Sequence, residues 1–332
     1  MKKTRIILTV VVALLSLSLL VSCNKKEEDN TPSTDVVYYT VTFDTNGGGE
    51  ITAQRVAAGG KVTMPPDPER ENYVFDCWTR NSVEWLFDAD TVKSDITLSA
   101  KWIAADSLFT YQPSEDASYA IITGTKLDSA DRLRLPATIS GLPVRAVAPS
   151  AFAGTSSEKF SEITLPESIT IIGEKAFESC TGIAITPAGK LTEIGSQAFL
   201  NCDSLTEVSF GEGLEIISYE AFSGCSSLKS LVFPSSLKTI EENAFAGCSS
   251  VATIIAHGAL STVEDSAFRE CSSLKTVFFY GTAEQIDALR ENAGKINDTF
   301  TGAKFYRYSE SKPTEEGDFW HFDTKGSPRV WG

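Results

Sequence analysis

Histidine and positive charge are scarce in this 332-residue chain. It holds two histidines, His257 and His321, and 29 lysine and arginine residues against 44 acidic ones, for a net charge of −15. Catalysis or metal binding through histidine therefore has little material. An acidic surface repels phosphate backbones and anionic lipid headgroups, which argues against nucleic-acid binding and against electrostatic adhesion to a membrane.

Recognisable catalytic and ligand-binding motifs are also missing. No serine, cysteine or lysine nucleophile stands in a known local motif, and Asn46–Gly49 lacks the lysine and the following helix of a phosphate loop. Asp88, Asp90 and Asp95 do not match a calcium loop and are expected to be turn residues. We therefore predict a protein that is not an enzyme, with no cofactor and no bound metal.

The chain has only one long apolar run, at its N-terminus. Ile6–Leu20 spans 15 residues, which is short for a transmembrane helix but suits the core of a signal peptide. The following Leu-Val-Ser-Cys resembles the bacterial lipobox, in which the cysteine, here Cys23, becomes lipidated and begins the mature chain. An ordinary signal peptide or an uncleaved anchor are the alternatives. Cleavage after Ser22 removes three basic residues and lowers the net charge to −18, and acyl chains on Cys23 attach the protein to a membrane without a spanning helix.

Residues 24–36 are polar and show no apolar period, so we expect a tether. Within them, Lys25–Asp29 resembles the basic-then-acidic signal that directs lipoproteins of the Bacteroidota to the outer face of the outer membrane. A solvated charge run is the alternative. The resemblance implies a lipid-anchored, surface-exposed outer-membrane protein.

Residues 37–103 have the pattern of a small β domain. Tyr39, Val41 and Phe43 alternate with their neighbours as in a half-buried strand, and Asn46–Gly49 marks a turn. The order YTVTFDTNGGG…DPERENYVFDCW…WLFDADTVKSDITLSAKW resembles the Listeria–Bacteroides repeat, also called the InlB B-type repeat. That family implies a β-grasp-like module of bacterial surface proteins. Cys77 stands where the family usually has glycine, and we expect it to be a small buried side chain.

A repeat of Ala-Phe and Cys organises the rest of the chain. Ala-Phe pairs end at six phenylalanines, separated by 25, 22, 23, 23 and 23 residues, and a cysteine follows five of them at a spacing of three. Such a period is typical of a solenoid, in which equivalent side chains of successive coils stack. The predicted structural ladder consists of Phe152, Phe177, Phe199, Phe222, Phe245 and Phe268 with Cys180, Cys202, Cys225, Cys248 and Cys271.

The five cysteines also admit disulfides or a metal site. Adjacent parallel strands would bring neighbouring thiols near bridging distance. Side chains in such a ladder point the same way, however, five thiols cannot all pair, and no histidine or carboxylate recurs beside them. We therefore expect buried free thiols.

Each coil carries one short strand and a second apolar pair on its return side. Strand patterns such as Leu228-x-x-Leu231-x-Phe233 recur, and the position between the last two inward residues points outward. In successive coils this position holds Ser209, Val232, Ile255 and Phe278. An exposed apolar stripe is costly unless a partner covers it, so we predict a partner-binding surface at Val232, Ile255 and Phe278. The simple β-propensity of these residues is the alternative explanation.

The repeated motif resembles the BspA-type leucine-rich repeats of bacterial surface proteins over about residues 118–308. The expected fold is mostly β: a small β-grasp-like domain, then a right-handed leucine-rich-repeat solenoid with one or two parallel strands per coil of about 23 residues. The expected segments are a signal peptide (1–22), Cys23 with the tether (23–36), the Listeria–Bacteroides repeat (37–103), an N-terminal cap with a first irregular coil (104–150), regular coils (151–281) and a C-terminal cap with tail (282–332).

Two features are expected near the C-terminus. Thr282 and Gln285 form a predicted capping box that opens a helix. In the tail, Phe319, Trp320, Phe322 and Trp331 are expected to cover the open end of the last coil, although Trp320–Phe322 also admits a ligand-binding role.

These resemblances imply a non-catalytic surface lipoprotein, with the small module as a stalk, that binds host or bacterial surface or matrix proteins through the sheet face of the coils. Two other functions stay open: capture of glycans for a nutrient-uptake system, and a purely structural spacer of the envelope. Membrane attachment would come from the lipid on Cys23, and nucleic acid is not an expected partner.

Overall fold

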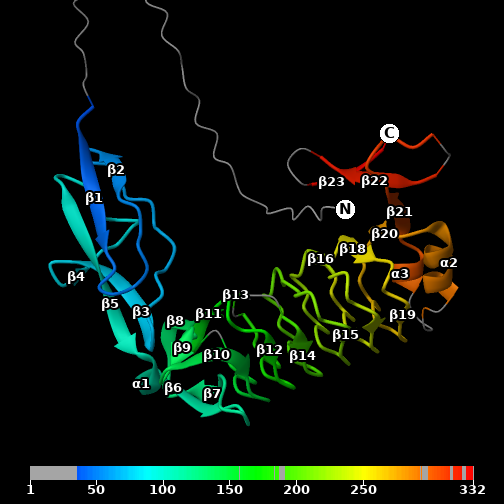
Figure 1. Ribbon diagram of the computed structural model, residues 1–332, viewed down its shortest axis with the longest axis horizontal. Helices are drawn as coiled ribbons and strands as arrows, with labels where there is room; N and C mark the ends of the chain where they lie inside the picture. The colour runs from blue at the N-terminus through cyan, green and yellow to red at the C-terminus, as the bar shows by residue number, and fades with distance from the viewer. Residues whose placement is uncertain are drawn as a thin grey trace, which may run out of the picture. The chain divides into compact units, whose positions relative to one another are not determined.

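The computed structural model describes residues 36–156, 158–182, 184–186, 191–291, 293, 298–314, 317–323 and 327–331 (Figure 1). Contacts divide the chain into two units, Met1–Val37 and Tyr38–Gly332. The predicted signal peptide, the lipidation site Cys23 and most of the tether lie outside the described residues. Every described residue from Tyr38 onward belongs to the second unit.

The first sheet has five strands in the order β2-β1-β5-β3-β4. β1 and β5 are parallel neighbours, and β2, β3 and β4 are added antiparallel at either side. This mixed arrangement, with the first and last strands paired, is that of a β-grasp, although residues 58–72 contain no helix. The strands are β1 (Tyr38–Asp44), β2 (Gln54–Ala57), β3 (Tyr73–Arg80), β4 (Val83–Glu84) and β5 (Ile96–Ala104).

Alternation along these strands builds the core of the first sheet. In β1 the side chains of Val41 and Phe43 are buried, and that of Thr42 between them is exposed. Phe43 meets Trp78 edge-to-face with ring centroids 5.0 Å apart. The predicted turn after β1 uses Asn46 and Gly47, whose φ angles of 51° and 92° explain why these two residue types occur there. Cys77 in β3 is a free thiol that is only half-buried, so its expected full burial is wrong.

A short connecting region leads from the first sheet into the coils. It comprises α1 (Ala105–Leu108), the antiparallel hairpin of β6 (Phe109–Pro113) and β7 (Ala120–Thr125), then β8 (Ala130–Arg134), β9 (Thr138–Ile139) and β10 (Leu142–Val147). β10 pairs in parallel with β7, and β8 with the first regular coil. This region therefore begins the parallel stacking that the coils continue.

Each regular coil contributes a strand to one or both of two sheets, one on each side of the coil, in which the strands pair in parallel. The longer strands are β11 (Phe160–Thr164), β13 (Ala184–Thr186), β16 (Ser230–Val232), β18 (Thr253–His257) and β20 (Thr276–Tyr280). Two-residue strands make the return side: β12 (Ile171–Ile172), β14 (Glu193–Ile194), β15 (Ile216–Ile217), β17 (Thr239–Ile240) and β19 (Thr262–Val263). Leu231, Ile254 and Val277 face one another across β16, β18 and β20, a step of one 23-residue coil. The predicted fold class is confirmed.

One predicted strand is wrong. Leu205–Phe210 forms only an isolated bridge, from Phe210 to Leu191, so the sheet of longer strands is interrupted between β13 and β16. The coil from Phe177 to Phe199 is one residue shorter than the later ones. The register on this side of the coil therefore differs from that of the coil that follows, and regular strand pairing stops at this step, although the amides of Phe177 and Phe199 still bond the next coil.

The phenylalanines form a continuous stack inside the coils. Successive rings from Phe152 to Phe268 lie nearly parallel, with centroids 5.2–5.5 Å apart. Phe300 extends the stack at 5.0 Å from Phe268, which the sequence pattern did not indicate. The amide N–H of each of these phenylalanines up to Phe245 donates to the carbonyl of the alanine one coil later, at 2.8–2.9 Å. The Ala-Phe pair therefore joins coils through its backbone as well as its ring.

The cysteines are free and buried, and they have a function in the coil that the sequence pattern did not indicate. Each thiol donates a hydrogen bond to the carbonyl of the phenylalanine one coil earlier, for example Cys225 Sγ to Phe199 O at 3.2 Å and Cys202 Sγ to Phe177 O at 3.0 Å. Burial raises the pKa of Cys271 to about 12 and that of Cys248 well above its usual range. These thiols are protonated donors at neutral pH.

The C-terminal region consists of α2 (Ala283–Glu291), α3 (Asp298–Thr301) and three more strands of the sheet, β21 (Lys304–Tyr308), β22 (Phe319–Phe322) and β23 (Pro328–Val330). The sheet runs in the order β16-β18-β20-β21-β22-β23 (Figure 1). Ile286, Leu289, Phe300 and Phe305 belong to the same buried cluster as the coils. The helices and β21 therefore close the end of the core, a role that the sequence pattern assigned to the tail.

Candidate protein-interaction face

The candidate site is the outer face of the sheet β16-β18-β20-β21. Two rows of side chains alternate with the inward residues and point away from the core. The first row is Val232, Ile255, Phe278 and Tyr306, which are paired in register across the four strands. The second row, one pleat further on, is His257, Tyr280 and Tyr308. Parallel pairing places each row in a line, with a step of 23 residues between β16, β18 and β20 and of 28 residues from β20 to β21.

The predicted stripe is present as a row, but its exposure changes along its length. Val232 is 55% exposed and Ile255 is half-buried. Phe278 is only 7% exposed, so its predicted place on an open surface is wrong. The rings of Tyr306 and Trp320 cover it, with centroids at 5.8 and 5.0 Å. Phe278 is therefore the closed position of the first row, Val232 is its most open aliphatic position, and Ile255 and Tyr306 are half-buried.

The second row was not predicted. The rings of His257 and Tyr280 are parallel at 4.6 Å, and Tyr308 follows Tyr280 at 4.5 Å. Burial lowers the pKa of His257, while nearby Glu212 opposes this change. Burial and the neighbouring Tyr308 raise the pKa of Tyr280 to about 12. Because side chains alternate along a strand, residues two positions after the first row point to the same face. This alternation could have predicted the second row from the sequence.

The tail lies on this outer face and does not cover the end of the core. Trp320 is fully buried and contacts Phe278, Tyr280 and Tyr308, with ring centroids 4.9–5.1 Å away. Its indole N–H donates to the carbonyl of Phe279 at 3.5 Å. Phe322 stays 41% exposed beside it. The predicted position of the tail aromatics is therefore corrected: β22 and β23 extend the sheet, and Trp320 folds back over β21 onto β20.

Other tail aromatics hold this arrangement in place. The guanidinium of Arg307 lies 4.4 Å from the ring centre of Phe319. His321 stacks on Trp331 at 3.9 Å, and the indole N–H of Trp331 donates to the carbonyl of Ser309 at 3.2 Å. His321 is thus packed against an aromatic ring of the same hairpin.

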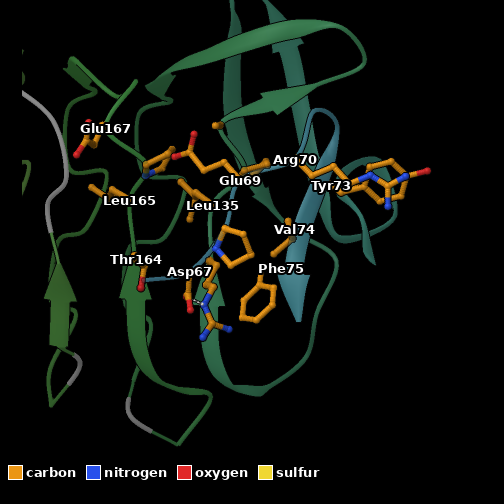
Figure 2. Close-up of a pocket in the computed structure, with 15 residues that line it drawn as sticks. Asp67, Glu69, Arg70, Tyr73, Val74, Phe75, Leu135, Thr164, Leu165 and Glu167 are labelled. Carbon is orange, nitrogen blue, oxygen red and sulfur yellow. Dashed lines mark hydrogen bonds and ion pairs between the residues drawn. The ribbon is translucent and has the colours of Figure 1, made fainter. Parts of the chain in front are cut away.

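A cavity of about 190 Å³ lies where the first sheet meets the start of the coils. Side chains from β3 and from the loop after β11 line it (Figure 2). Within it Asp67 accepts from Arg134 Nε at 2.6 Å, and the Arg134 guanidinium lies 5.7 Å from the centre of the Phe75 ring. Asp67 and Arg134 are thus paired with each other and are not a free charge for an incoming ligand.

The aspartates considered for a cation are engaged separately, Asp95 and Asp90 through their carboxylates and Asp88 through its backbone carbonyl. Asp95 accepts from the amide of Thr40 at 2.7 Å, Asp90 accepts from the amide of Leu86 at 2.8 Å, and the carbonyl of Asp88 accepts from Lys61. Within the described ranges, no three His, Cys, Asp or Glu side chains lie together as a metal site requires. Asp88 and Asp90 lie in or beside one turn, as predicted, whereas Asp95 joins the start of β5 to Thr40 of β1.

No helix in the described part of the chain is long and apolar enough to cross a bilayer.

Comparison with known proteins identifies both segments of the chain. Residues 140–252 and 192–292 match the BspA type leucine rich repeat region, in six copies. Residues 39–101 match the Listeria-Bacteroides repeat domain. The chain therefore belongs to the BspA-type leucine-rich repeat proteins and carries a Listeria-Bacteroides repeat domain before the repeats. Leucine-rich repeat families are in general scaffolds for protein interaction.

Several solved structures of bacterial leucine-rich repeat proteins are similar to this chain. The T. pallidum leucine rich repeat protein (TpLRR) is 30% identical, with 59% of this chain and 97% of that chain covered and a TM-score of 0.48. A leucine rich cell surface protein from Faecalibacterium prausnitzii A2-165 is 23% identical over 54% of this chain and 40% of that chain, with a TM-score of 0.38.

Curated relatives match a short stretch only. A protein of Evansella cellulosilytica named as a Gly-rich membrane protein is 39% identical over 67 residues, and one named as a membrane protein is 34% identical over 71 residues. The matches cover 19% and 20% of this chain, and the chain spans 8% and 11% of the lengths of these relatives.

Proposed function

We propose that this protein is a non-catalytic, surface-exposed lipoprotein that binds host or bacterial proteins through the outer face of its coils. In this proposal residues 1–22 are removed, Cys23 carries the lipid in the outer membrane, and residues 24–36 are the tether. Residues 37–103 form the small module, 104–150 and 282–332 are caps, and 151–281 are the regular coils. Membership of a family of surface proteins supports the location.

One observation carries the proposal: an apolar surface is left open on a flat sheet. Val232 and Ile255 lie side by side on β16 and β18, and Val232 is more than half exposed. The short turns on either side of these strands leave the face accessible, which is the usual binding geometry of a solenoid. An exposed aliphatic pair beside aromatic side chains is typical of the centre of a protein interface.

The aromatic residues favour a protein partner over a glycan. A sugar ring binds on an open aromatic face, whereas the facing sides of His257 and Tyr280 are stacked on each other and Tyr308 follows Tyr280 closely. Trp320, the largest ring of the group, is fully buried. The second row therefore presents ring edges to solvent, which suits hydrogen bonds and apolar contacts with a polypeptide better than sugar stacking.

Protein and glycan arrays, probed with the full chain, test this function. We expect protein ligands that are lost when Val232→Ser and Ile255→Ser are combined, because both changes remove apolar contact area from one patch. Ile216→Ser is the matched control: Ile216 is 46% exposed but lies on β15, in the return stack. Glycan ligands alone would replace the proposal by glycan capture, and silence on both arrays would favour an envelope spacer.

A further inference from the structure

The tail of this protein shows what kind of side chain the outer face accepts. Trp320 sits across the two rows where Phe278 belongs to the first and Tyr280 to the second, and no part of its side chain reaches solvent. Its main chain adds to the sheet edge through β21. An extended segment that carries an aromatic side chain is therefore bound on this face within the molecule itself.

Translation along the coils repeats that seat. Val232 corresponds to Ile255 and Phe278 in the first row, and His257 corresponds to Tyr280 in the second. Pro234 lies buried next to β16, one coil before His257 in the same line. Ile255 and His257 thus stand one coil before Phe278 and Tyr280, with a smaller apolar side chain and an imidazole in place of the phenol, and Val232 adds open apolar surface beside them.

The two seats differ in what covers them. Phe278 is covered by Tyr306 and Trp320, whereas Val232 is more than half exposed and Ile255 and His257 are half-buried. One face therefore holds an aromatic residue at one end and leaves the equivalent position open at the other. Flat aromatic rings pack well over aliphatic side chains and imidazoles, so the open seat has the chemistry for the same kind of occupant.

We propose that Val232, Ile255 and His257 form a second seat that takes an aromatic side chain from an extended segment of a partner protein, in the manner in which Trp320 occupies the first. This inference rests on the proposed protein-binding function and specifies the partner segment. The partner carries a tryptophan or a similar ring on an exposed, extended stretch, and that ring is its main anchor.

A peptide copy of the tail tests the seat without knowledge of the natural partner. The probe is fluorescein-labelled Gly-Asp-Phe-Trp-His-Phe-Asp, the sequence of residues 317–323, titrated with the full chain and followed by fluorescence anisotropy. We expect saturable binding, weakened at least about tenfold by V232S combined with I255S and unchanged by I216S. The same peptide with alanine in place of tryptophan should lose binding to a similar degree.

Three outcomes would overturn the inference. In the first, the peptide does not bind the wild-type chain. In the second, binding appears only after Trp320→Ala empties the first seat, or is insensitive to V232S and I255S. In the third, the chain self-associates in sedimentation velocity through Val232 and Ile255, which would make a second copy the occupant. Protein ligands on the array that ignore V232S and I255S would end this inference while leaving a protein-binding function intact elsewhere on the chain.

Discussion

Each cysteine of the coils joins its own turn to the turn before it. The carbonyl of each phenylalanine from Phe152 to Phe245 accepts a hydrogen bond from the thiol one coil later, at 3.0–3.2 Å. Each of these carbonyls also accepts the backbone amide three residues later, at 3.2 Å, so the thiol uses the second acceptor position of a carbonyl that is already bonded within its own coil. The spacing predicted buried thiols, but their hydrogen bonds needed the coordinates, because a sequence period says which residues stack and not which atoms point at each other.

The buried thiols make stability depend on alkaline pH. Burial raises the pKa of Cys271 in the folded chain to about 12, while the pKa of a thiol in the unfolded chain is about 8.5. Its contribution is complete below the unfolded pKa and is lost as the pH rises toward the folded one, because the unfolded chain releases its proton first. Between pH 8 and 10 we expect the free energy of unfolding of Cys271→Ala to fall about 2 kcal/mol less than that of the wild type.

Urea unfolding at the two pH values measures this difference. Thr276→Ser, in the same coil and without an ionisable group, should show the wild-type dependence. Equal pH dependence in the wild type and Cys271→Ala would contradict the assignment of a buried, protonated thiol.

Most strands of the coils, and the start of α2, could be predicted from the local apolar pattern and from helix-capping residues. The strands β16, β18 and β20 fall inside the predicted apolar repeats, since period-two alternation against one core leaves little freedom of register. The strand at Leu205–Phe210 fails where a coil is one residue short. An apolar pair marked the return side of each coil, but two residues are too few to predict a strand, and stacking against neighbouring coils makes these segments strands.

The predicted capping box of α2 is confirmed and gives a second test. The amide of Thr282 donates to Gln285 Oε1 at 2.9 Å, and the amide of Gln285 donates to Thr282 Oγ1 at 3.3 Å. We expect Thr282→Ala to lower the free energy of unfolding by about 1 kcal/mol, because an amide at the helix start loses its acceptor, while Thr282→Ser retains most of it.

A double-mutant cycle with Gln285→Ala isolates the pair. The sum of the two single losses in unfolding free energy should exceed the loss of the double variant, since each single change already removes the same reciprocal contact. Additive losses would show that the box contributes nothing as a unit. Gln285 also donates to the carbonyl of Gly258 at 3.3 Å, so its single loss should be the larger.

Within residues 38–332, the first sheet keeps a buried cluster of its own but touches the interior of the coils at its edge. Val74 of β3 and Ala105 of α1 belong to the buried cluster that continues through the coils. Asn72 joins them: its amide donates to Thr138 Oγ1 and its side-chain oxygen accepts from the amide of Gly141, both at 2.6 Å. The resemblance implied a small module that serves as a stalk ahead of the coils. Its contact with their first strands makes it part of the closure of the core at that end.

Asn72 supplies the third test, at the level of the joint. Its φ of +63° is a conformation that asparagine and glycine adopt at a lower cost than alanine. We expect Asn72→Asp to retain most of the stability, because it keeps the acceptor. Asn72→Gly should lose a little, and Asn72→Ala should lose about 1–2 kcal/mol from backbone strain together with the missing acceptor. Urea unfolding followed by circular dichroism gives the order, and equal stability of all three variants would contradict the role of the joint.

The sequence by itself determined the coil, its length and the side chains that fill it, because identical residues at a constant period bury their surface only by stacking on their own copies. The tertiary structure alone decided what the last aromatic residues cover. Trp320 rests on Phe278, 42 residues earlier in the chain, and hydrophobicity does not specify which of several apolar surfaces such a ring will choose. That choice closed one end of the outer face and left Val232 and Ile255 open at the other.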